Sequence, residues 1–322
     1  MANDWNAQTS DPKARKLMQG FPPEPGLIVR PDEVGLPGNT FPNTRWSFSH
    51  QREMKATVNI RRGGSSTYVF PRKLRSDIDG IAFTTQEGQL LTWAQSLDAL
   101  FTDGIVVLHR GTIVYETFRG ALEPHLPHIA FSVTKSFVGV IAAMLAHEGA
   151  LDQGALVTRY VPELAGTAYG DATVGQVMDM TIGVQYVENY TDPLAEVRTY
   201  GIAAGYSPPP PGYAGPDTIF DFLRTLKKQG EHGQAFAYKT CNTEVLSWIV
   251  QRITGTPTAQ LISERIWQKL GVEEDAYIIV DRIGAAACGG GMNLCLRDLA
   301  RFGEMLRLGG VFNGHEIVPE EV

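Results

Sequence analysis

A serine and a lysine that stand three residues apart, Ser132 and Lys135, are the residues best suited to chemistry in this sequence. On a helix, this spacing puts both side chains on one face, close enough to hydrogen-bond. A serine hydroxyl becomes a good nucleophile only when a base takes its proton, and a lysine is a base only when it is neutral, a state that burial favours. A helix start also favours developing negative charge. The pair therefore predicts acyl transfer through a covalent serine intermediate.

The Ser-x-x-Lys pattern has little specificity by itself. A second copy, Ser10-Asp-Pro-Lys13, contains a proline and no apolar helix follows it, so we interpret it as accidental. The first copy opens the most apolar helix candidate of the chain, residues 131–147. Even there, a capping serine and a lysine whose stem lies along apolar surface would give the same pattern without catalysis.

A tyrosine motif lies about a hundred residues further on, in Phe236-Ala-Tyr238-Lys-Thr240-Cys-Asn242. Together with Ser132 and Lys135, this motif resembles those of serine β-lactamases and penicillin-binding proteins. The resemblance implies that Tyr238 exchanges protons with the nucleophile and the leaving group. In the usual motif an asparagine lies two residues after the tyrosine, but here Thr240 stands there and Asn242 is two further on. We expect both to contact the substrate, with Thr240 able to donate a hydrogen bond to Lys135 or to a substrate carbonyl.

From about residue 43 onward, the sequence more closely resembles the 6-aminohexanoate-dimer hydrolases, a cytoplasmic group related to family VIII carboxylesterases. The resemblance rests on Arg45-Trp-Ser-Phe48, on Ser132 to Ser136, and on segments 160–166, 186–193 and 242–246, as well as on 289–301. It implies a β-lactamase/transpeptidase-like fold. It also implies that Tyr186 contacts the leaving amine of a bound amide, whereas we expect Tyr190 to be structural.

One family feature is missing from the sequence. Relatives carry a third motif, Lys-Thr-Gly or His-x-Gly, on a strand that supplies one backbone N–H of the oxyanion hole. No such tripeptide follows Gly289, and the sequence ends at Val322. We expect either that the chain continues or that another segment supplies the donor; the other donor is expected to be the N–H of Ser132. Loss of one such donor costs on the order of 10²- to 10³-fold in rate.

The surrounding pattern predicts an α/β (α+β) fold with an antiparallel sheet, flanking helices and an all-helical insertion. Residues 1–80 are rich in Pro, Gly and Asn and predict an extended arm pinned by an aromatic group at Trp46. Residues 81–152 and 276–322 predict an α/β lobe, which includes a hairpin over 104–118 turning at Arg110-Gly111. Residues 153–275 predict a mostly helical lobe.

Composition excludes several other classes of protein. The chain has 322 residues with a formal net charge of −7, which argues against general nucleic-acid binding. Its three cysteines, Cys241, Cys288 and Cys295, are too few and scattered for a disulfide framework or a zinc cluster, and their odd number suits a reducing compartment. No signal peptide is apparent, and the longest apolar run, 138–146, is about half of a membrane span. We therefore expect a cytoplasmic protein without metal or cofactor.

These observations favour a serine hydrolase that cleaves short linear amides such as aminohexanoate oligomers. Short-chain carboxyl esters are an almost equal alternative, and β-lactamase action is less favoured. A non-catalytic module that resembles a penicillin-binding protein is the rival of another class, and the missing third motif is its best support. As partners we expect a small-molecule amide or ester, no nucleic acid and no membrane, with a homodimer as a possible assembly.

Overall fold

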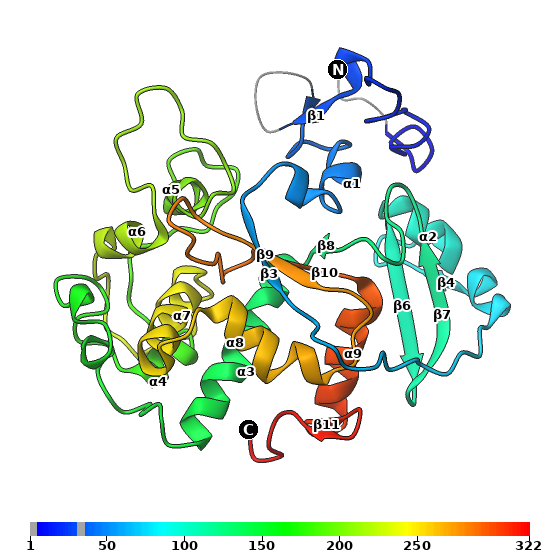
Figure 1. Cartoon of the computed structure of the whole chain (residues 1–322). Helices are drawn as coiled ribbons and strands as arrows, with labels where there is room; N and C mark the ends of the chain where they lie inside the picture. The colour runs from blue at the N-terminus through cyan, green and yellow to red at the C-terminus, as the bar shows by residue number, and fades with distance from the viewer. Residues whose placement is uncertain (1–4, 31–35) are drawn as a thin grey trace.

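An apolar helix, α3 (Thr134–His147), runs away from the central sheet beside helices α7 and α8 in the computed structural model (Figure 1). The model describes residues 5–30 and 36–322. Phe137, Val138 and Ile141 of α3 are buried, as the apolar pattern predicts. Gly149, two residues after the end of the helix, has a positive φ of 73°, the left-handed conformation expected of a glycine that caps a helix.

The central sheet has four antiparallel strands in the order β3 (Thr57–Ile60), β9 (Ala276–Ile279), β10 (Met292–Leu294) and β8 (His128–Ile129). Strand β9 is buried along its whole length, which explains its unbroken apolar sequence. Strand β8 ends two residues before the turn that holds Ser132. The sheet therefore places the start of α3 directly beside the start of β10.

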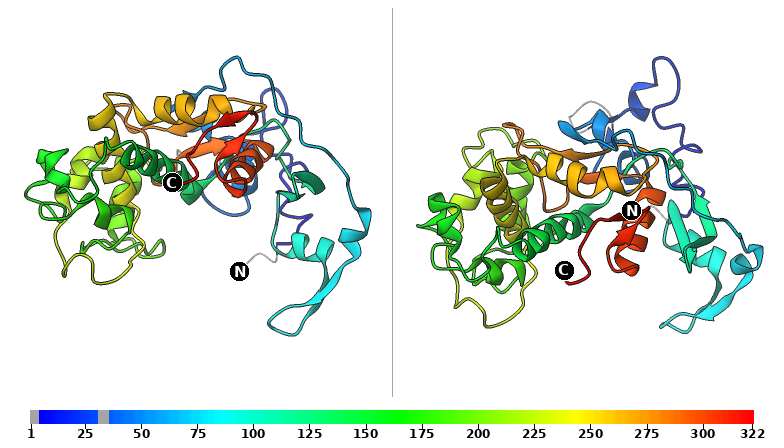
Figure 2. Two further views of the ribbon diagram at one scale, coloured as in Figure 1. Left: turned by 90° about the horizontal axis from the view of Figure 1, so that it is seen from below. Right: turned by 60° about the horizontal axis from the view of Figure 1, so that its bottom comes forward.

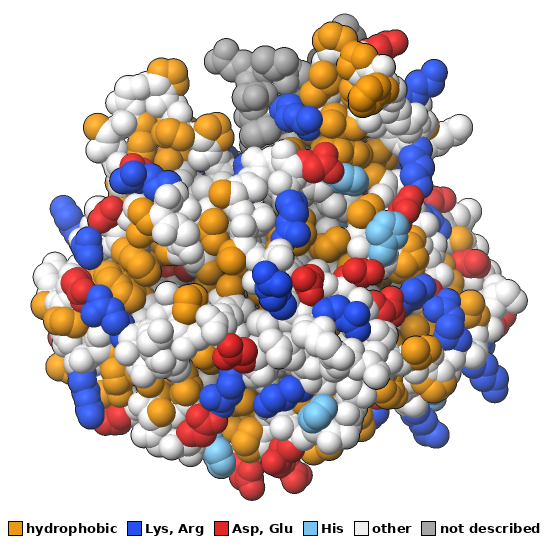
Figure 3. All heavy atoms as spheres, viewed as in Figure 1, with side chains coloured by type: hydrophobic (Ala, Val, Ile, Leu, Met, Phe, Trp, Pro, Cys, Tyr) orange, Lys and Arg blue, Asp and Glu red, His pale blue; other side chains and the backbone are white. Residues whose placement is uncertain are grey.

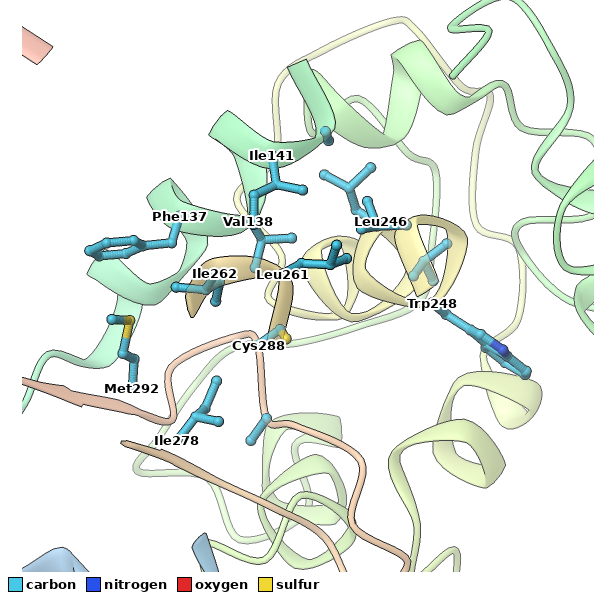
Figure 4. Close-up of a cluster of buried hydrophobic side chains, with 14 of the residues drawn as sticks. Phe137, Val138, Ile141, Leu246, Trp248, Leu261, Ile262, Ile278, Cys288 and Met292 are labelled. Atoms are coloured by element: carbon cyan, nitrogen blue, oxygen red, sulfur yellow. The ribbon is translucent and has the colours of Figure 1, made fainter. Parts of the chain in front are cut away.

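Helices α7 (Cys241–Thr254) and α8 (Thr258–Arg265) pack on α3 and complete the core. Figure 4 shows side chains of α3, α7 and α8 meeting those of the sheet, with Cys288 among them. The first ten residues of α7, from Cys241 to Val250, are all buried. On the other side of α3, the rings of Phe137 and Phe302 stack with their centroids 3.9 Å apart.

The region that sequence predicts as a helical lobe contains α4 (Val174–Met178), α5 (Glu196–Ala203) and α6 (Ile219–Thr225), joined by long loops. Thr173 caps α4 in a capping box with Gln176, and the hydroxyl of Thr218 caps α6. Helix α5 and the loop after it form one side of the candidate site.

The predicted hairpin is present as β6 (Gly104–His109) and β7 (Thr112–Phe118). Arg110 and Gly111 both have positive φ, 49° and 76°, as a tight two-residue hairpin turn requires. In the part of the chain that the structure describes, the hairpin forms a sheet of its own and packs on α9 (Leu296–Arg307). Both views in Figure 2 place it at the opposite end of the molecule from the helical region.

The segment predicted as an extended arm, residues 1–80, is partly built into the core. Its strand β3 forms an edge of the central sheet, and Trp46 is buried against His50, as expected of an anchoring aromatic. The buried guanidinium of Arg45 pairs with Asp103 at 2.5 Å. The arm therefore reaches the sheet and approaches the site, although its residues 1–4 and 31–35 lie outside the described part.

The remaining elements are short. They are β1 (Val29–Arg30), β2 (Leu36–Pro37), β4 (Ala82–Thr84), β5 (Leu90–Thr92), β11 (Val311–Phe312), β12 (His315–Glu316), α1 (Thr44–Ser47), α2 (Trp93–Ala99), and the 3₁₀ turns η1 (Pro25–Leu27), η2 (Gln51–Glu53), η3 (Ser76–Gly80), η4 (Phe131–Val133), η5 (Val157–Arg159), η6 (Pro162–Leu164) and η7 (Trp267–Lys269). Among the described helices, none has the length and apolar character to cross a bilayer.

Candidate active site

Ser132 and Lys135 face each other at the start of α3. Ser132 lies in the 3₁₀ turn η4, and Lys135 lies in the first turn of the helix. The Nζ atom of Lys135 is 2.9 Å from the Oγ atom of Ser132, so the hydrogen bond that the spacing predicts is present. Ser132 is exposed to solvent, as a nucleophile must be. The second copy of the pattern forms no such pair, because Lys13 lies near Glu123 instead.

The turn that carries the serine is fixed by the end of the sheet. The buried Thr134 hydroxyl donates to the carbonyl oxygen of Phe131 at 2.7 Å and accepts from the N–H of Met292 at 3.1 Å. The N–H of Ala130 donates to the carbonyl of Met292 at 2.8 Å. Phe131 itself has a φ of 44°, a strained conformation for a residue with a large side chain. Strand β10 therefore holds the nucleophile in a defined position.

Two further groups surround the amine of Lys135. Its Nζ donates to the carbonyl oxygen of Gly289 at 2.5 Å, and it lies 5.0 Å from the ring centre of Tyr238. Tyr238 is 45% exposed, and its hydroxyl makes no hydrogen bond to Ser132 or Lys135 in the described structure. The structure thus brings together the three residues predicted to be catalytic, with the ring of Tyr238, rather than its hydroxyl, in contact with the amine.

A buried carboxylate, Glu244 of α7, lies behind Gly289. Its Oε1 accepts from the N–H of Gly289 at 2.7 Å and from the hydroxyl of Tyr200 at 2.5 Å, and its Oε2 accepts from the N–H of Cys288 at 3.2 Å. Glu244 therefore fixes the peptide whose carbonyl receives Lys135. Sequence reasoning did not single out this residue. The available signal was an acidic side chain inside an otherwise apolar helix.

Burial raises the pKa of Glu244 to about 7, because the apolar surroundings disfavour the charged form. The hydrogen bonds from Tyr200, Gly289 and Cys288 and the charge of Lys135 act in the opposite direction and favour the carboxylate. Burial outweighs these hydrogen-bond donors, so Glu244 gains or loses its proton near neutral pH.

Thr240 lies at the start of α7 and lines the cavity, but its polar groups are already occupied. Its N–H donates to Oε2 of Glu188 at 2.9 Å, and its hydroxyl donates to Oε1 of the same carboxylate at 2.7 Å. The hydroxyl proton therefore goes to Glu188, and not to Lys135 as we expected.

Tyr186 and Asn242, both expected to contact substrate, lie behind the wall of the site. The side chain of Asn242 is 1% exposed and its Oδ1 accepts from the hydroxyl of Tyr169 at 2.8 Å. Tyr186 is also buried, with its ring 6.2 Å from that of Phe222, and burial raises the pKa of its phenol. Neither lines the cavity in the described structure, because the start of α7 turns Asn242 into the core.

Tyr190, which we expected to be structural, does line the cavity. It is 62% exposed, and its hydroxyl donates to Oε1 of Glu188 at 2.8 Å. Glu188 therefore receives hydrogen bonds from both Tyr190 and Thr240, and it was not singled out from the sequence. Burial and the bond to Glu188 raise the pKa of Tyr190.

The cavity in front of Ser132 has a volume of about 690 Å³, large enough for a small organic molecule. One side is formed by residues 48–55 and the other by α5 and its following loop, including Tyr206. Figure 3 shows the molecule hollowed at its upper edge, between the regions of α1 and α5. The described residues contain no group of three His, Cys, Asp or Glu side chains arranged to hold a metal ion.

The three cysteines are buried and free, and burial raises the pKa of each thiol, that of Cys241 to about 12. A thiol in such surroundings is a poor nucleophile. Cys241, the one nearest to Tyr238 in the sequence, is therefore part of the core. The arrangement at Ser132 carries the chemistry.

Comparisons with known proteins agree with this geometry. Residues 93–320 match the family model described as Beta-lactamase. A 6-aminohexanoate-dimer hydrolase from Paenarthrobacter ureafaciens is 37% identical over 279 residues, which is 87% of this chain and 68% of the relative. A structure titled as a putative 6-aminohexanoate-dimer hydrolase from Bacillus anthracis superposes with a TM-score of 0.83 at 33% identity, covering 88% of this chain and 74% of the other.

More distant structures share the fold. A putative beta-lactamase from Bacteroides dorei has a TM-score of 0.54 at 19% identity, over 71% of this chain and 65% of the other. The comparisons confirm the predicted α/β fold with an antiparallel sheet and flanking helices.

Proposed function

This chain belongs to the β-lactamase family of serine hydrolases, and from that premise we propose that it cleaves short linear amides through an acyl-enzyme on Ser132. The observation that carries the proposal is the 2.9 Å approach of Lys135 Nζ to Ser132 Oγ. The amine is held there by the carbonyl of Gly289, and that carbonyl belongs to a peptide fixed by Glu244. A capping serine with a solvated lysine would need none of this support.

In the proposed first half-reaction, the neutral amine of Lys135 takes the proton of the Ser132 hydroxyl, and Oγ attacks the substrate carbonyl carbon. The negative charge that develops on the carbonyl oxygen is stabilised by the backbone N–H of Ser132 at the helix start. The phenol of Tyr238 gives its proton to the leaving nitrogen and regains one from the Lys135 ammonium. The C–N bond breaks, the amine departs, and the acyl group stays on Oγ.

Water completes the second half-reaction by the same groups. Lys135, with Tyr238, removes a proton from the water as its oxygen attacks the acyl carbon. The bond to Oγ breaks, Ser132 regains its proton, and a carboxylic acid leaves. The substrate class is supported by the names of two relatives. They are the 6-aminohexanoate-dimer hydrolase from Paenarthrobacter ureafaciens and the putative 6-aminohexanoate-dimer hydrolase from Bacillus anthracis.

The test is a burst experiment followed by a substrate panel. Wild type is expected to release p-nitrophenol from p-nitrophenyl acetate in a burst equal to the enzyme concentration, and Ser132→Ala is expected to give none. Ser136→Ala, which removes an exposed neighbouring hydroxyl, serves as the matched control and should keep the burst. A burst that survives in Ser132→Ala contradicts the assignment.

The panel compares an aminohexanoate dimer, a short alkyl ester and nitrocefin at equal concentration. The proposal expects the linear amide to be hydrolysed by wild type and not by Ser132→Ala. Hydrolysis of the ester alone would replace the amide by the ester as the substrate class, and turnover of nitrocefin alone would assign β-lactamase activity. Neither of these results is compatible with the amide proposal.

A further inference from the structure

Tyr238 stands near the end of a loop that has little contact with the core. Between α6 and α7, residues 227–236 are exposed to solvent at every position except His232. A segment with few buried apolar contacts is held mainly by its hydrogen bonds, and it opens easily when they are lost. The position of the phenol beside Lys135 therefore depends on the groups that fasten this loop.

The loop lies against one neighbouring segment, residues 180–185. The two backbones approach so closely that a Cβ on Gly183 would lie 2.7 Å from the carbonyl oxygen of Gly230. Backbone hydrogen bonds of 2.8 to 3.0 Å join the two segments, and they run from the N–H to the carbonyl in the pairs Gln185 to Lys227, Gln229 to Gly183, Gly233 to Thr181, and Ala237 to Met180.

His232 adds a side-chain hydrogen bond between the same two segments. Its ring is 5% exposed, and Nδ1 accepts from the N–H of Gly183 at 3.0 Å. The other ring nitrogen, Nε2, lies 3.1 Å from Oδ1 of Asp171. The N–H of Gly183 has no backbone acceptor within the described part of the chain, so the imidazole supplies the acceptor.

Asp171 determines which nitrogen of His232 carries the proton. A neutral imidazole has one donor and one acceptor nitrogen, and Nδ1 can accept from Gly183 only if the proton is on Nε2. The Oδ2 atom of Asp171 accepts from Lys228, and the hydrogen bonds from Lys228 and His232 lower the pKa of this carboxyl. Its Oδ1 therefore accepts from Nε2–H, and the ring is held in the orientation that receives Gly183.

The loop that His232 fastens leads directly to the site. Tyr238 follows His232 by six residues, and its ring centre lies 5.0 Å from Nζ of Lys135. Lys239, the next residue, donates to the carbonyl oxygen of Val184 in the same neighbouring segment. Tyr238 therefore lies between two side chains that bind the loop to residues 180–185.

We propose that His232 is a positioning residue for Tyr238: its imidazole accepts from Gly183 and holds the loop so that the phenol reaches the leaving group. The inference rests on the proposed function, in which Tyr238 gives its proton to the leaving nitrogen. The described residues that line the cavity do not include His232, so it acts through Tyr238 and not by touching the substrate. Its loss should weaken that proton transfer and leave the attack of Ser132 in place.

Two substrates with different leaving groups separate these steps. p-Nitrophenolate is a stable anion and leaves without a proton, whereas an alkylamine or an alkoxide leaves only when it is protonated. The first substrate is p-nitrophenyl acetate. The second is whichever of the aminohexanoate dimer and the short alkyl ester wild type turns over. For each substrate, kcat/KM includes every step up to acylation.

His232→Leu removes both hydrogen bonds of the ring. It is expected to lower kcat/KM for the second substrate by about tenfold and to change that for p-nitrophenyl acetate by less than about twofold. His232→Asn keeps an acceptor near the position of Nδ1 and should restore most of the loss, whereas His232→Gln reaches toward Asp171 alone and should not. His315→Leu, which removes an exposed histidine of β12, is the control.

A double variant tests whether His232 acts through Tyr238. If it does, Tyr238→Phe combined with His232→Leu loses no more kcat/KM than Tyr238→Phe alone. Additive losses would overturn the inference, as would an equal loss for both substrates in His232→Leu, because His232 would then support the whole site. Equal recovery in the Asn and Gln variants would also overturn it. If His232→Leu does not fold by circular dichroism, the Asn and Gln variants decide the question.

The outcomes also separate this inference from the proposed function. A normal burst on Ser132, with His232→Leu equal to wild type on both substrates, overturns the positioning role and leaves the hydrolase proposal intact. A normal burst without turnover of either the amide or the alkyl ester overturns it as well, because no leaving group then receives the proton. Absence of the burst in wild type instead contradicts the hydrolase proposal itself.

Discussion

The floor and the rim of the site are built differently. The floor, defined as Glu244, Tyr200 and the Gly289 peptide, is buried, and hydrogen bonds of 2.5 and 2.7 Å join its groups. The rim, defined as Tyr238 and Tyr190, is 45% and 62% exposed. A group with buried, fully used hydrogen bonds has one position, whereas an exposed phenol can adjust to a ligand. The difference indicates that the floor sets the position of Lys135 and that the rim meets the substrate.

Substitutions in the floor, behind Lys135, are therefore expected to lower kcat, and substitutions in the rim are expected to raise KM. Four substitutions and two pH measurements test this division, beginning with the group that the floor positions.

Lys135→Met is expected to have the largest effect on the rate. It removes the base while keeping a side chain of similar length, so acylation should fall about 10³-fold. Stopped-flow measurement of the p-nitrophenyl acetate burst gives this rate, and circular dichroism checks the fold. A burst within tenfold of wild type would mean that another group takes the proton of Ser132.

Glu244→Gln is expected to lower kcat by about tenfold with little change in KM. The amide nitrogen would face the N–H of Cys288 or of Gly289, so the Gly289 carbonyl would no longer be held for Lys135. Steady-state kinetics measures both constants. Glu264→Gln, an exposed carboxylate on α8, is the control and should behave like wild type. A rise in KM alone would place Glu244 with the rim.

The pH dependence sharpens the assignment of Glu244. Because its pKa is raised to about 7, lowering the pH below 7 adds a proton and removes an acceptor from the floor, so kcat should fall on the acid side. Glu244→Gln should lose that part of the profile. If the fall of kcat at acid pH persists unchanged in Glu244→Gln, another group causes it.

Stability should respond to pH through the same residue. Between the unperturbed value of 4.5 and about 7, the folded protein retains a proton that the unfolded chain has released, so this contribution to stability falls as the pH rises. The free energy of unfolding of wild type, measured with urea across this range, should therefore fall relative to that of Glu244→Gln. If the free energies of unfolding of the two proteins change in parallel with pH, the raised pKa of Glu244 is contradicted.

Thr240→Val tests the junction between floor and rim. It removes the hydroxyl donor to Glu188 but keeps the backbone N–H bond, so a loss of roughly fivefold in kcat/KM is expected. Thr225→Val, which removes a hydroxyl bonded within α6, is the control. No change in kcat/KM would mean that Glu188 is positioned without this bond.

Tyr190→Phe should have the smallest effect, a rise in KM of about twofold to threefold with kcat unchanged, since one exposed hydrogen bond to Glu188 is lost. Titration of initial rates against substrate concentration measures it. A large fall in kcat would mean that the phenol acts in the chemical step, and the division between floor and rim would fail.

Ser132 and Lys135 could be predicted from the sequence because the pattern that marks them spans only a few residues. Ser132 and Lys135 are three residues apart on an apolar helix, and the hairpin turn at Arg110-Gly111 is equally short-range. Each depends on a few neighbouring residues and elementary geometry. The fold class followed from the same patterns.

The floor and the sheet order were not predictable, because they join distant segments. Glu244 meets Tyr200 and Gly289, which are 44 and 45 residues away, and nothing in the spacing of these residues marks the contact. Strand β3 lies in a segment whose composition indicates an extended arm, and only its pairing with β9 shows its place. Asn242 was assigned to the substrate by its position in a motif, but the start of α7 turns it inward.

The most direct test of the account is covalent labelling with a fluorophosphonate, followed by peptide mass spectrometry. Wild type is expected to gain one adduct, on the peptide that contains Ser132, with labelling slowed by roughly 100-fold in Lys135→Met. An adduct on another residue, or labelling that proceeds equally in Ser132→Ala, would contradict the central claim that Ser132 is the nucleophile and Lys135 its base.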